Sequence, residues 1–249
     1  MDVIDDIIAG LDGDCVVKEV YSCAHWTAVK TRNWGLASSI LESHPYHGIV
    51  RNAGILRGLA ALELAEYARS DNTHEASIGI ATINSMIDID DDDCVVENAL
   101  DVLLEKGRGK RVAVIGHFPW VPKLKEVARE FWVIEQRQRD DDLSADTAEK
   151  VLPKVDIVGI TGTSLINHTF VRLMELCQGS FVVMIGPSSP MSPALFKYGV
   201  NVISGARVVQ PERMLACITE GAIFRQVEGV KLVSMRKRAE ENKNRGERT

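Results

Sequence analysis

Three short apolar segments in the second half of the chain each run directly into a loop of Gly, Pro, Ser, Thr and Asn. They are VAVIGHFPW (Val112 to Trp120), IVGITGTSLIN (Ile157 to Asn167) and FVVMIGPSSPMSP (Phe181 to Pro193). An uninterrupted apolar run predicts a strand buried on both faces, as in a parallel sheet covered by helices. Such sheets bind ligands at the carboxyl ends of their strands. The three loops are therefore predicted to meet in one binding crevice.

The second half of the chain has the strand–helix alternation of a doubly wound sheet. Strands are predicted at Arg111 to Gly116, Phe131 to Glu135, Val155 to Ile160, Phe181 to Ile185 and Val200 to Ile203. Helices are predicted at Val95 to Lys106 and at Leu165 to Leu176, and prolines mark further helix starts at Pro122, Pro193 and Pro211.

The first third has a different pattern. Two runs of β-branched and aromatic residues over Val16 to Thr31 predict an antiparallel hairpin, with a third short strand at Trp34 to Ala37. Helices are predicted at Met1 to Leu11, Leu56 to Ser70 and His74 to Ile87. The acidic run Asp88 to Asp93 marks a break. We therefore predict a small α+β domain over residues 1–93, a parallel-sheet domain over 94–235 and a charged flexible tail over 236–249.

The composition excludes several classes of protein. A net charge of -6 gives no basic surface for nucleic acid or for an anionic membrane. No apolar segment is long enough to span a bilayer, and the acidic start differs from a signal peptide, which predicts a cytoplasmic protein. The five cysteines are scattered, form no C-x-x-C motif or disulfide framework, and are expected to be mostly buried: Cys15, Cys23, Cys94, Cys177 and Cys217.

The loop of the second segment places Thr161, Gly162, Thr163 and Ser164 between a predicted strand and a predicted helix. At a helix N-terminus, unpaired N–H groups and the helix dipole stabilise phosphate or carboxylate. These residues are therefore predicted to bind an anionic group, with Asn167 as a further amide contact. Simple helix capping by Ser and Thr is the alternative.

The loop of the third segment places two serines between two prolines, in the order Gly186, Pro187, Ser188, Ser189 and Pro190. Proline restricts the loop and reduces the entropy lost when the serine hydroxyls hold a ligand. We predict that this loop contacts the ligand, and a rigid turn without a ligand is the alternative. The loop lacks the G-x-S-x-G elbow of a serine hydrolase.

The loop of the first segment departs from a dinucleotide-binding fingerprint. Gly116 stands alone where three glycines are required, and Phe118 would obstruct a pyrophosphate. Glu135 ends the next strand, where an acidic residue commonly accepts a ribose hydroxyl. A nucleoside-like or polyhydroxy ligand, including S-adenosylmethionine, therefore stays open, and a surface salt bridge is the alternative role for Glu135. His117 is expected to face the crevice as the candidate for acid–base catalysis, against a plain surface role.

No metal site built by the protein alone is predicted. The histidines lack H-x-x-x-H and H-E-x-x-H spacing, and the cysteines lack ligand spacing. Asp88 to Asp93 lacks the glycine and the distal glutamate of a calcium loop, so a solvated acidic linker is favoured.

In the same order, these segments resemble those of a two-domain family named for putative heavy-metal chelation. TGTSLIN and GPSSP together are fairly specific, and the resemblance covers nearly the whole chain apart from the charged tail. It rests on His25-Trp26-Thr27, Asn33-Trp34-Gly35, SIGIATINS (Ser77 to Ser85), GHFP (Gly116 to Pro119), VIEQ (Val133 to Gln136), DIVGITGTSLIN (Asp156 to Asn167) and GPSSPMSPALFKYGV (Gly186 to Val200).

The resemblance implies an α/β protein in which a small α+β domain, similar to the enolase N-terminal domain, precedes a doubly wound Rossmann-like domain. The implied site lies where the domains meet, with Trp26, Thr27, Asn33 and Asn84 on the wall opposite the three loops. The implied role is the synthesis or handling of a metal chelator such as a pterin-, flavin- or siderophore-like molecule. Fold resemblance does not by itself carry an activity.

The sequence thus favours an enzyme-like protein that binds a small anionic or heteroaromatic metabolite in an interdomain crevice. It identifies no cofactor. Two alternatives stay open: a non-catalytic protein that binds a metal or metal chelate, and an adenosylmethionine-dependent methyltransferase. The expected partner is a small molecule, including a metal chelate, with no nucleic acid or membrane, and a homo-oligomer stays open.

Overall fold

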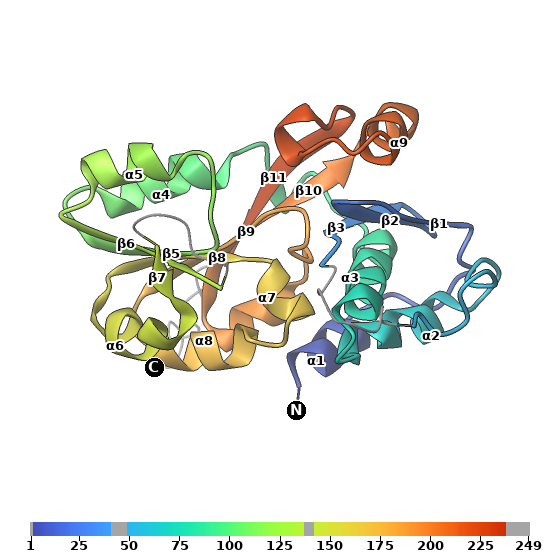
Figure 1. The fold of residues 1–249 in the computed structure, drawn as a ribbon, viewed down its shortest axis with the longest axis horizontal. Coiled ribbons are helices and arrows are strands. Elements are labelled where there is room, and N and C mark those ends of the chain that lie inside the picture. Colours follow the sequence, from blue (N-terminus) through green and yellow to red (C-terminus); the bar gives the residue numbers. More distant parts are fainter. Residues whose placement is uncertain (1, 41–48, 137–141, 238–249) are drawn as a thin grey trace, which may run out of the picture.

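Two separate β-sheets organise the chain in the computed structural model, which describes residues 2–40, 49–136 and 142–237. The small antiparallel sheet contains β1 (Glu19–Ser22), β2 (Trp26–Lys30) and β3 (Trp34–Ser38). The large sheet has the order β4-β11-β10-β9-β8-β5-β6-β7. Its strands are β4 (Cys94–Val95), β5 (Arg111–Ile115), β6 (Glu130–Glu135), β7 (Leu143–Ser144), β8 (Ile157–Thr161), β9 (Phe181–Ile185), β10 (Val200–Val208) and β11 (Val230–Arg236). Figure 1 shows the two sheets side by side.

The large sheet is doubly wound. Neighbouring strands from β10 to β7 are parallel, whereas β11 and β4 continue the sheet in antiparallel pairs. The chain passes from β5 outward to β6 and β7, and then returns to β8 on the other side of β5. This reversal places the carboxyl ends of β5 and β8 next to one another, which is where such sheets bind ligands. The predicted α/β fold class is confirmed.

Helices cover both faces of the large sheet because alternate strand residues point to opposite faces. Val112 and Val114 pack with Leu103 of α4 (Ala99–Gly107) and Leu124 of α5 (Val121–Val127). Between those two valines, Ala113 packs in the cluster that holds Phe170 of α8 (Phe170–Leu176). The helices α6 (Ala148–Val151) and α7 (Thr163–Ile166) also lie on the second face (Figure 1).

The first third of the chain forms a compact unit of the small sheet with α1 (Val3–Ala9), α2 (Ala61–Ala65) and α3 (Thr73–Met86). Two glycines let α3 lie close to its neighbours. A Cβ added to Gly35 of β3 would lie 2.0 Å from the carbonyl oxygen of Ala81, and one added to Gly79 would lie 2.0 Å from the nitrogen of Ala68. The glycine inside α3 therefore serves close packing, which offsets its low helix propensity.

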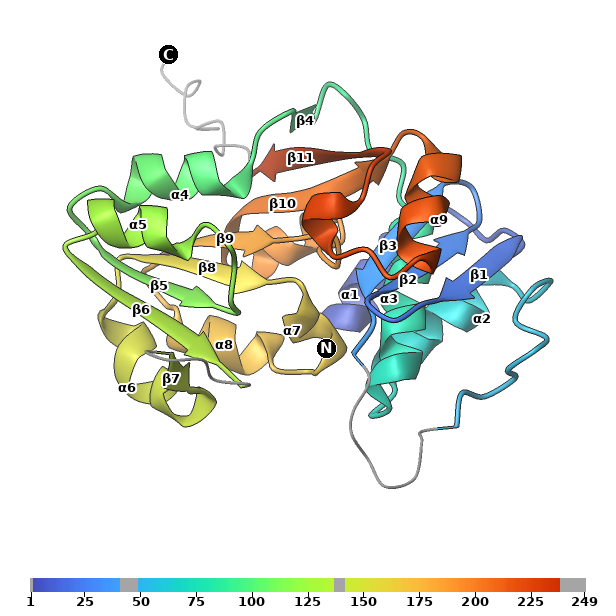
Figure 2. The same cartoon turned by 45° about the horizontal axis from the view of Figure 1, so that its top comes forward.

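An arm from the second half of the chain covers the other face of the small sheet. The nine-residue β10 extends past β9 and leads into α9 (Pro211–Thr219), from which β11 returns (Figure 2). Met214 and Ile218 of α9 pack against Trp26, Ala28 and Leu36. The two halves thus share a hydrophobic core, and a domain boundary at residue 93 stays a prediction.

Three predicted helices are wrong in their extents. Val95 pairs in β4, and α4 begins only after Asn98, whose side chain accepts a hydrogen bond from the Leu100 N–H. The predicted helix over Leu56 to Ser70 begins late, because Gly58 adopts φ +92° in a turn that precedes α2. The helix predicted over Leu165 to Leu176 is broken between α7 and α8, where His168 adopts φ 57°.

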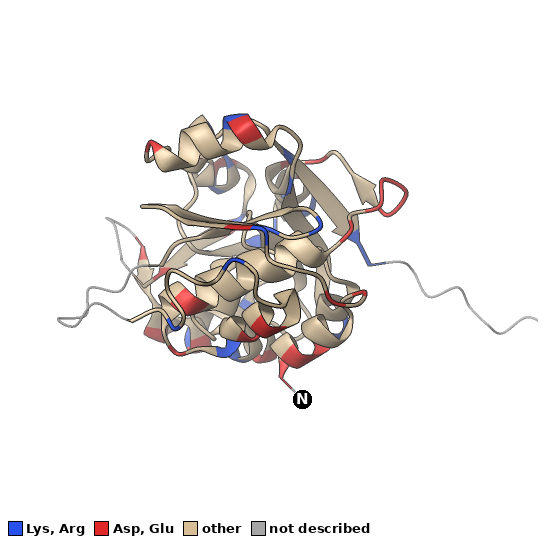
Figure 3. Cartoon of the chain, turned by 90° about the vertical axis from the view of Figure 1, so that its right-hand side faces the viewer, with Lys and Arg blue, Asp and Glu red and all other residues tan. Residues whose placement is uncertain are grey.

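The acidic run Asp88 to Asp93 is an exposed turn with its own contacts to both halves. The Asn33 side-chain amide donates to Asp88 at 2.6 Å, and Arg207 pairs with Asp91 at 2.5 Å. Elsewhere in the view of Figure 3, acidic and basic residues are interspersed along the helices and loops. None of the helices in the described ranges has the length and apolar composition that a membrane span requires.

Candidate functional site

A pocket of about 860 Å³ lies between the two sheets, at the carboxyl ends of β5, β6, β8 and β9. This volume suits a small metabolite. Twelve of the residues predicted from the sequence line it: Trp26, Gly116, His117, Phe118, Glu135, Thr161, Thr163, Ser164, Asn167, Gly186, Pro187 and Ser188. The convergence of the three polar loops on one crevice is therefore what the structure shows.

Six predicted residues lie outside this lining and serve packing or hydrogen bonding: Thr27, Asn33, Asn84, Gly162, Ser189 and Pro190. Thr27 is fully buried and bonds Ser39 at 2.9 Å. The Asn84 amide donates to the carbonyls of Leu36, at 2.9 Å, and Pro187, at 3.1 Å, and so joins the two halves of the chain. Thr27 and Asn84 thus support the pocket by bonding two residues of its lining, Ser39 and Pro187.

The end of β5 carries the pocket's acid–base candidate. Gly116 adopts φ +100°, which favours glycine, and its N–H donates to the Ile134 carbonyl at 3.0 Å. The chain then turns, and the Nδ1 atom of His117 lies 3.1 Å from Oδ2 of Asp142. The Asp142 side chain is only 6% exposed. A buried carboxylate beside an imidazole holds one ring nitrogen and leaves the other for a ligand.

Aromatic rings line the pocket from both halves of the chain. Phe118 and Trp120 stack with their ring centroids 4.7 Å apart and an interplanar angle of 12°. From the other half, Trp26 meets Phe224 at 5.4 Å, and its indole N–H donates to the Ala222 carbonyl at 2.9 Å. Both pairs belong to the lining. Such surfaces favour a planar ligand.

The end of β8 does not form the expected backbone cradle for an anion. The Gly162 N–H donates to the Ile185 carbonyl at 2.8 Å, and the Thr163 N–H donates to the Thr161 hydroxyl at 3.3 Å. The helix that follows, α7, has one turn only. The prediction is therefore wrong for these two N–H groups, and the loop presents the hydroxyls of Thr161 and Thr163, which lie 3.0 Å apart.

The end of β9 docks onto the small sheet. The Ser188 hydroxyl accepts a hydrogen bond from the Ser38 N–H at 2.9 Å and lies 3.2 Å from the Ser38 hydroxyl. Pro187 to Pro190 are buried. Gly162 lies against this loop, since an added Cβ would be 2.6 Å from backbone atoms of Ser188 and Ser189. The rigid turn that the prolines favour thus joins two site loops to β3.

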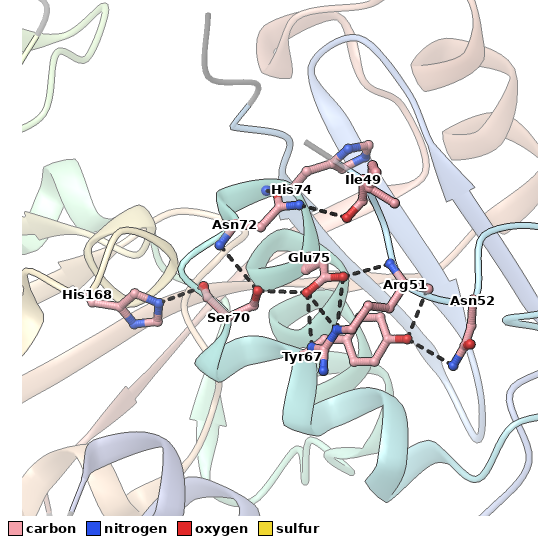
Figure 4. A network of polar contacts seen from close by, with 9 residues as sticks. All are labelled: Ile49, Arg51, Asn52, Tyr67, Ser70, Asn72, His74, Glu75 and His168. Atoms are coloured by element: carbon pink, nitrogen blue, oxygen red, sulfur yellow. Dashed lines mark hydrogen bonds and ion pairs between the residues drawn. The ribbon is translucent and has the colours of Figure 1, made fainter. Parts of the chain in front are cut away.

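A polar network supports one edge of the pocket (Figure 4). The buried Glu75 accepts hydrogen bonds from Arg51 and from the Ser70 hydroxyl, and the Ser70 carbonyl lies 2.9 Å from Nε2 of His168, next to Asn167. Burial raises the pKa of Glu75, but the hydrogen bonds from Arg51 and Ser70 outweigh it and leave that pKa below its ordinary value. Because His168 follows α7, the network links both halves beside the pocket.

The sequence did not indicate several lining residues: Ser38, Ser39, Ile40, Thr73, Asn98, Trp120, Gln136, Thr169, Phe224 and Arg225. Trp120 stands in the GHFPW loop and could have been included. Phe224 and Arg225 arrive on the arm between β10 and β11, which no local pattern reveals. Within the described ranges, no three His, Cys, Asp or Glu side chains come together as a metal-binding group.

Comparisons with known proteins give a consistent result. Two family models, both described as putative heavy-metal chelation, match residues 4–87 (DUF4213) and 98–236 (DUF364). An uncharacterized protein of Methanocaldococcus jannaschii is 26% identical over 189 residues, which cover 73% of this chain and 72% of that protein.

Two crystal structures of DUF364 proteins with unknown function are similar to this chain. The protein of Desulfitobacterium hafniense is 24% identical, with a TM-score of 0.80 over 94% of this chain and 97% of that one. The protein of Pyrococcus horikoshii is 18% identical, with a TM-score of 0.78 over 94% of this chain and 98% of that one. At these identities the structures show the fold that the chains share.

Proposed function

We propose that this chain, which belongs to the family described as putative heavy-metal chelation, binds a planar chelating metabolite in the pocket between its two sheets. The main support for this proposal is the composition of the pocket. Around a volume of about 860 Å³, it combines two pairs of aromatic residues, the hydroxyls of the loops after β8 and β9, and His117, whose ring is paired with the Asp142 carboxylate. Pterin-, flavin- and catechol-like siderophore groups share the planar ring and the oxygen donors that such a lining would recognise.

In this proposal the ligand supplies most of the donor atoms that hold the metal. His117 and Glu135 are the side chains of the described lining that commonly ligate metals. Two such groups give fewer protein ligands than the three or four that usually hold a transition metal. A chelate supplies the missing donors itself. Arg225, an exposed residue of the lining from the arm, offers a positive charge to an anionic chelate.

Titration of the protein with nitrocatechol, with its zinc complex and with zinc alone tests this function. Trp26 and Trp120 line the pocket, so a ring that enters should quench tryptophan fluorescence. Nitrocatechol or its zinc complex should bind, with free zinc weaker by about tenfold or more. Tight binding of zinc alone, with no response to either organic probe, would contradict the proposal.

A matched pair of variants tests whether the probe binds inside the pocket. Phe118→Ala removes one ring of the lining stack and should weaken binding about tenfold, because loss of an aromatic contact and its buried area costs roughly 1–2 kcal/mol. Phe196→Ala removes a partly buried ring outside the lining and should leave affinity unchanged. Equal affinities for the two variants would place the probe elsewhere.

A second candidate function rests on Glu135. This carboxylate ends β6 and lines the pocket, where it could accept the ribose hydroxyls of S-adenosylmethionine. Calorimetric titration with S-adenosylmethionine distinguishes the two functions. Binding that is lost in Glu135→Gln supports a methyltransferase, whereas absence of binding leaves the chelate proposal.

A further inference from the structure

The pair formed by His117 and Asp142 stands at the carboxyl ends of the sheet, on segments that are distant in the chain. His117 follows β5, and Asp142 directly precedes β7, with β6 between these strands. The Nδ1–Oδ2 distance is 3.1 Å. The carboxylate is more than nine-tenths buried, whereas the imidazole is 32% exposed and lines the pocket. A buried acceptor behind a histidine whose ring borders a cavity resembles the support of a general base.

Hydrogen-bond chemistry fixes what this pair can do. A carboxylate can only accept, so the Nδ1 atom of His117 must carry the shared proton. The neutral ring then has its lone pair on Nε2. If Nε2 gains a proton, the carboxylate stabilises the resulting imidazolium. Asp142 is therefore a positioning residue, and His117 is the group that would touch a ligand.

The proposed ligand class requires loss of a proton. A phenolic or enolic hydroxyl binds a metal ion well only after its proton leaves. Besides His117, the ionisable residues of the described lining are Glu135 from β6 and Arg225 from the arm. The guanidinium favours an anionic ligand, whereas Glu135 opposes one and would instead accept its hydrogen bonds.

We propose that the His117–Asp142 pair deprotonates the chelating hydroxyl of the bound ring and so prepares it to hold a metal ion. The O–H bond breaks, an N–H bond forms at Nε2, and the electron pair stays on the ligand oxygen. The reverse transfer would release the metal from the chelate. This inference rests on the proposed function, and it assigns the pocket a proton-transfer activity in addition to binding.

Nitrocatechol also tests this step, since its phenolate and its phenol differ in visible absorbance. Spectra are recorded at saturating protein over a pH series. For the wild type, the apparent ionisation constant of the bound probe should exceed that of the free probe by about tenfold, equivalent to one pKa unit. His117→Gln should bind the probe and lose this shift, and Asp142→Asn should lose most of it. His25→Gln, a matched change at an exposed histidine outside the lining, should keep it.

A shift that survives in His117→Gln would overturn the inference while leaving ligand binding intact. Failure of the wild type to bind nitrocatechol without zinc would overturn this inference, and failure to bind its zinc complex as well would overturn the proposed function. A measurement without ligand tests the pair itself: ¹⁵N NMR of His117 should show the proton on Nδ1 in the wild type and on Nε2 to a larger extent in Asp142→Asn. A proton on Nε2 in the folded wild-type protein would also overturn the inference.

Discussion

Gly162→Ala is the sharpest test of how the two site loops meet. Gly162 has φ -60° and ψ -19°, a helical conformation that alanine adopts without strain. In open space this change would therefore stabilise the protein by about 0.4–1 kcal/mol through the unfolded state. Here an added Cβ would lie 2.6 Å from backbone atoms of Ser188 and Ser189, closer than real Cβ contacts come. The sign of the effect thus separates a tight contact from an open loop.

We expect Gly162→Ala to destabilise the protein by about 1–3 kcal/mol, the usual cost of overpacking. For a chain of this size, that cost lowers the thermal midpoint by about 2–12 °C. Urea unfolding followed by circular dichroism gives the free energy, and nitrocatechol affinity should fall because the loops of β8 and β9 must separate.

Gly10→Ala is the matched control. Gly10 has φ -87°, and its added Cβ would make only ordinary contacts at 3.5 Å. This variant should be as stable as the wild type or slightly more so. A Gly162→Ala protein that is no less stable than the wild type would refute the close contact between the two loops.

Three further predictions concern buried side chains. Hydrogen bonds lower the pKa of the buried Glu75 in the folded state. The stabilisation from Glu75 is therefore present above the ordinary pKa of about 4.3 and is lost as the pH falls through the lowered value. Glu75→Gln should lower the free energy of unfolding by about 1–3 kcal/mol at pH 7 and reduce the further loss of stability at acid pH, and an unchanged loss at acid pH would contradict this. Burial raises the pKa of Cys177 to about 12, so at pH 8 a thiol reagent should modify it only on unfolding, as peptide mapping would show; rapid modification in the native state would be inconsistent with that burial. Ser188→Ala leaves the Ser38 N–H without its acceptor and should destabilise the protein by about 1–2 kcal/mol in urea unfolding, whereas a wild-type midpoint would mean that this bond contributes nothing.

The strands of the large sheet could be predicted from the sequence because their signal is local. Continuous apolar runs identified β5, β8 and β9, and the doubly wound topology followed from the strand–helix alternation. That topology is also why Gly116, Thr161 and Gly186 reach one pocket. The residues at strand ends can be placed once the fold class is known, even where the predicted bounds of the elements are inexact.

The rest of the site depends on contacts between distant segments. Asp142 lies in a run of aspartates whose sequence resembles a solvated surface, and only the position of β7 brings it to His117. Phe224 arrives through packing of α9 on the small sheet. The break between α7 and α8 has no Gly or Pro, so sequence periodicity passes through it unnoticed.

The anomalous scattering of zinc in crystals soaked with the zinc–nitrocatechol complex tests the central claim most directly. We expect one strong peak inside the pocket, with the ring beside Phe118 and its oxygens toward His117. Crystals soaked with zinc alone should lack this peak. The same peak without nitrocatechol, or a complex bound only outside the pocket, would contradict the claim that the pocket recognises a planar metal chelate.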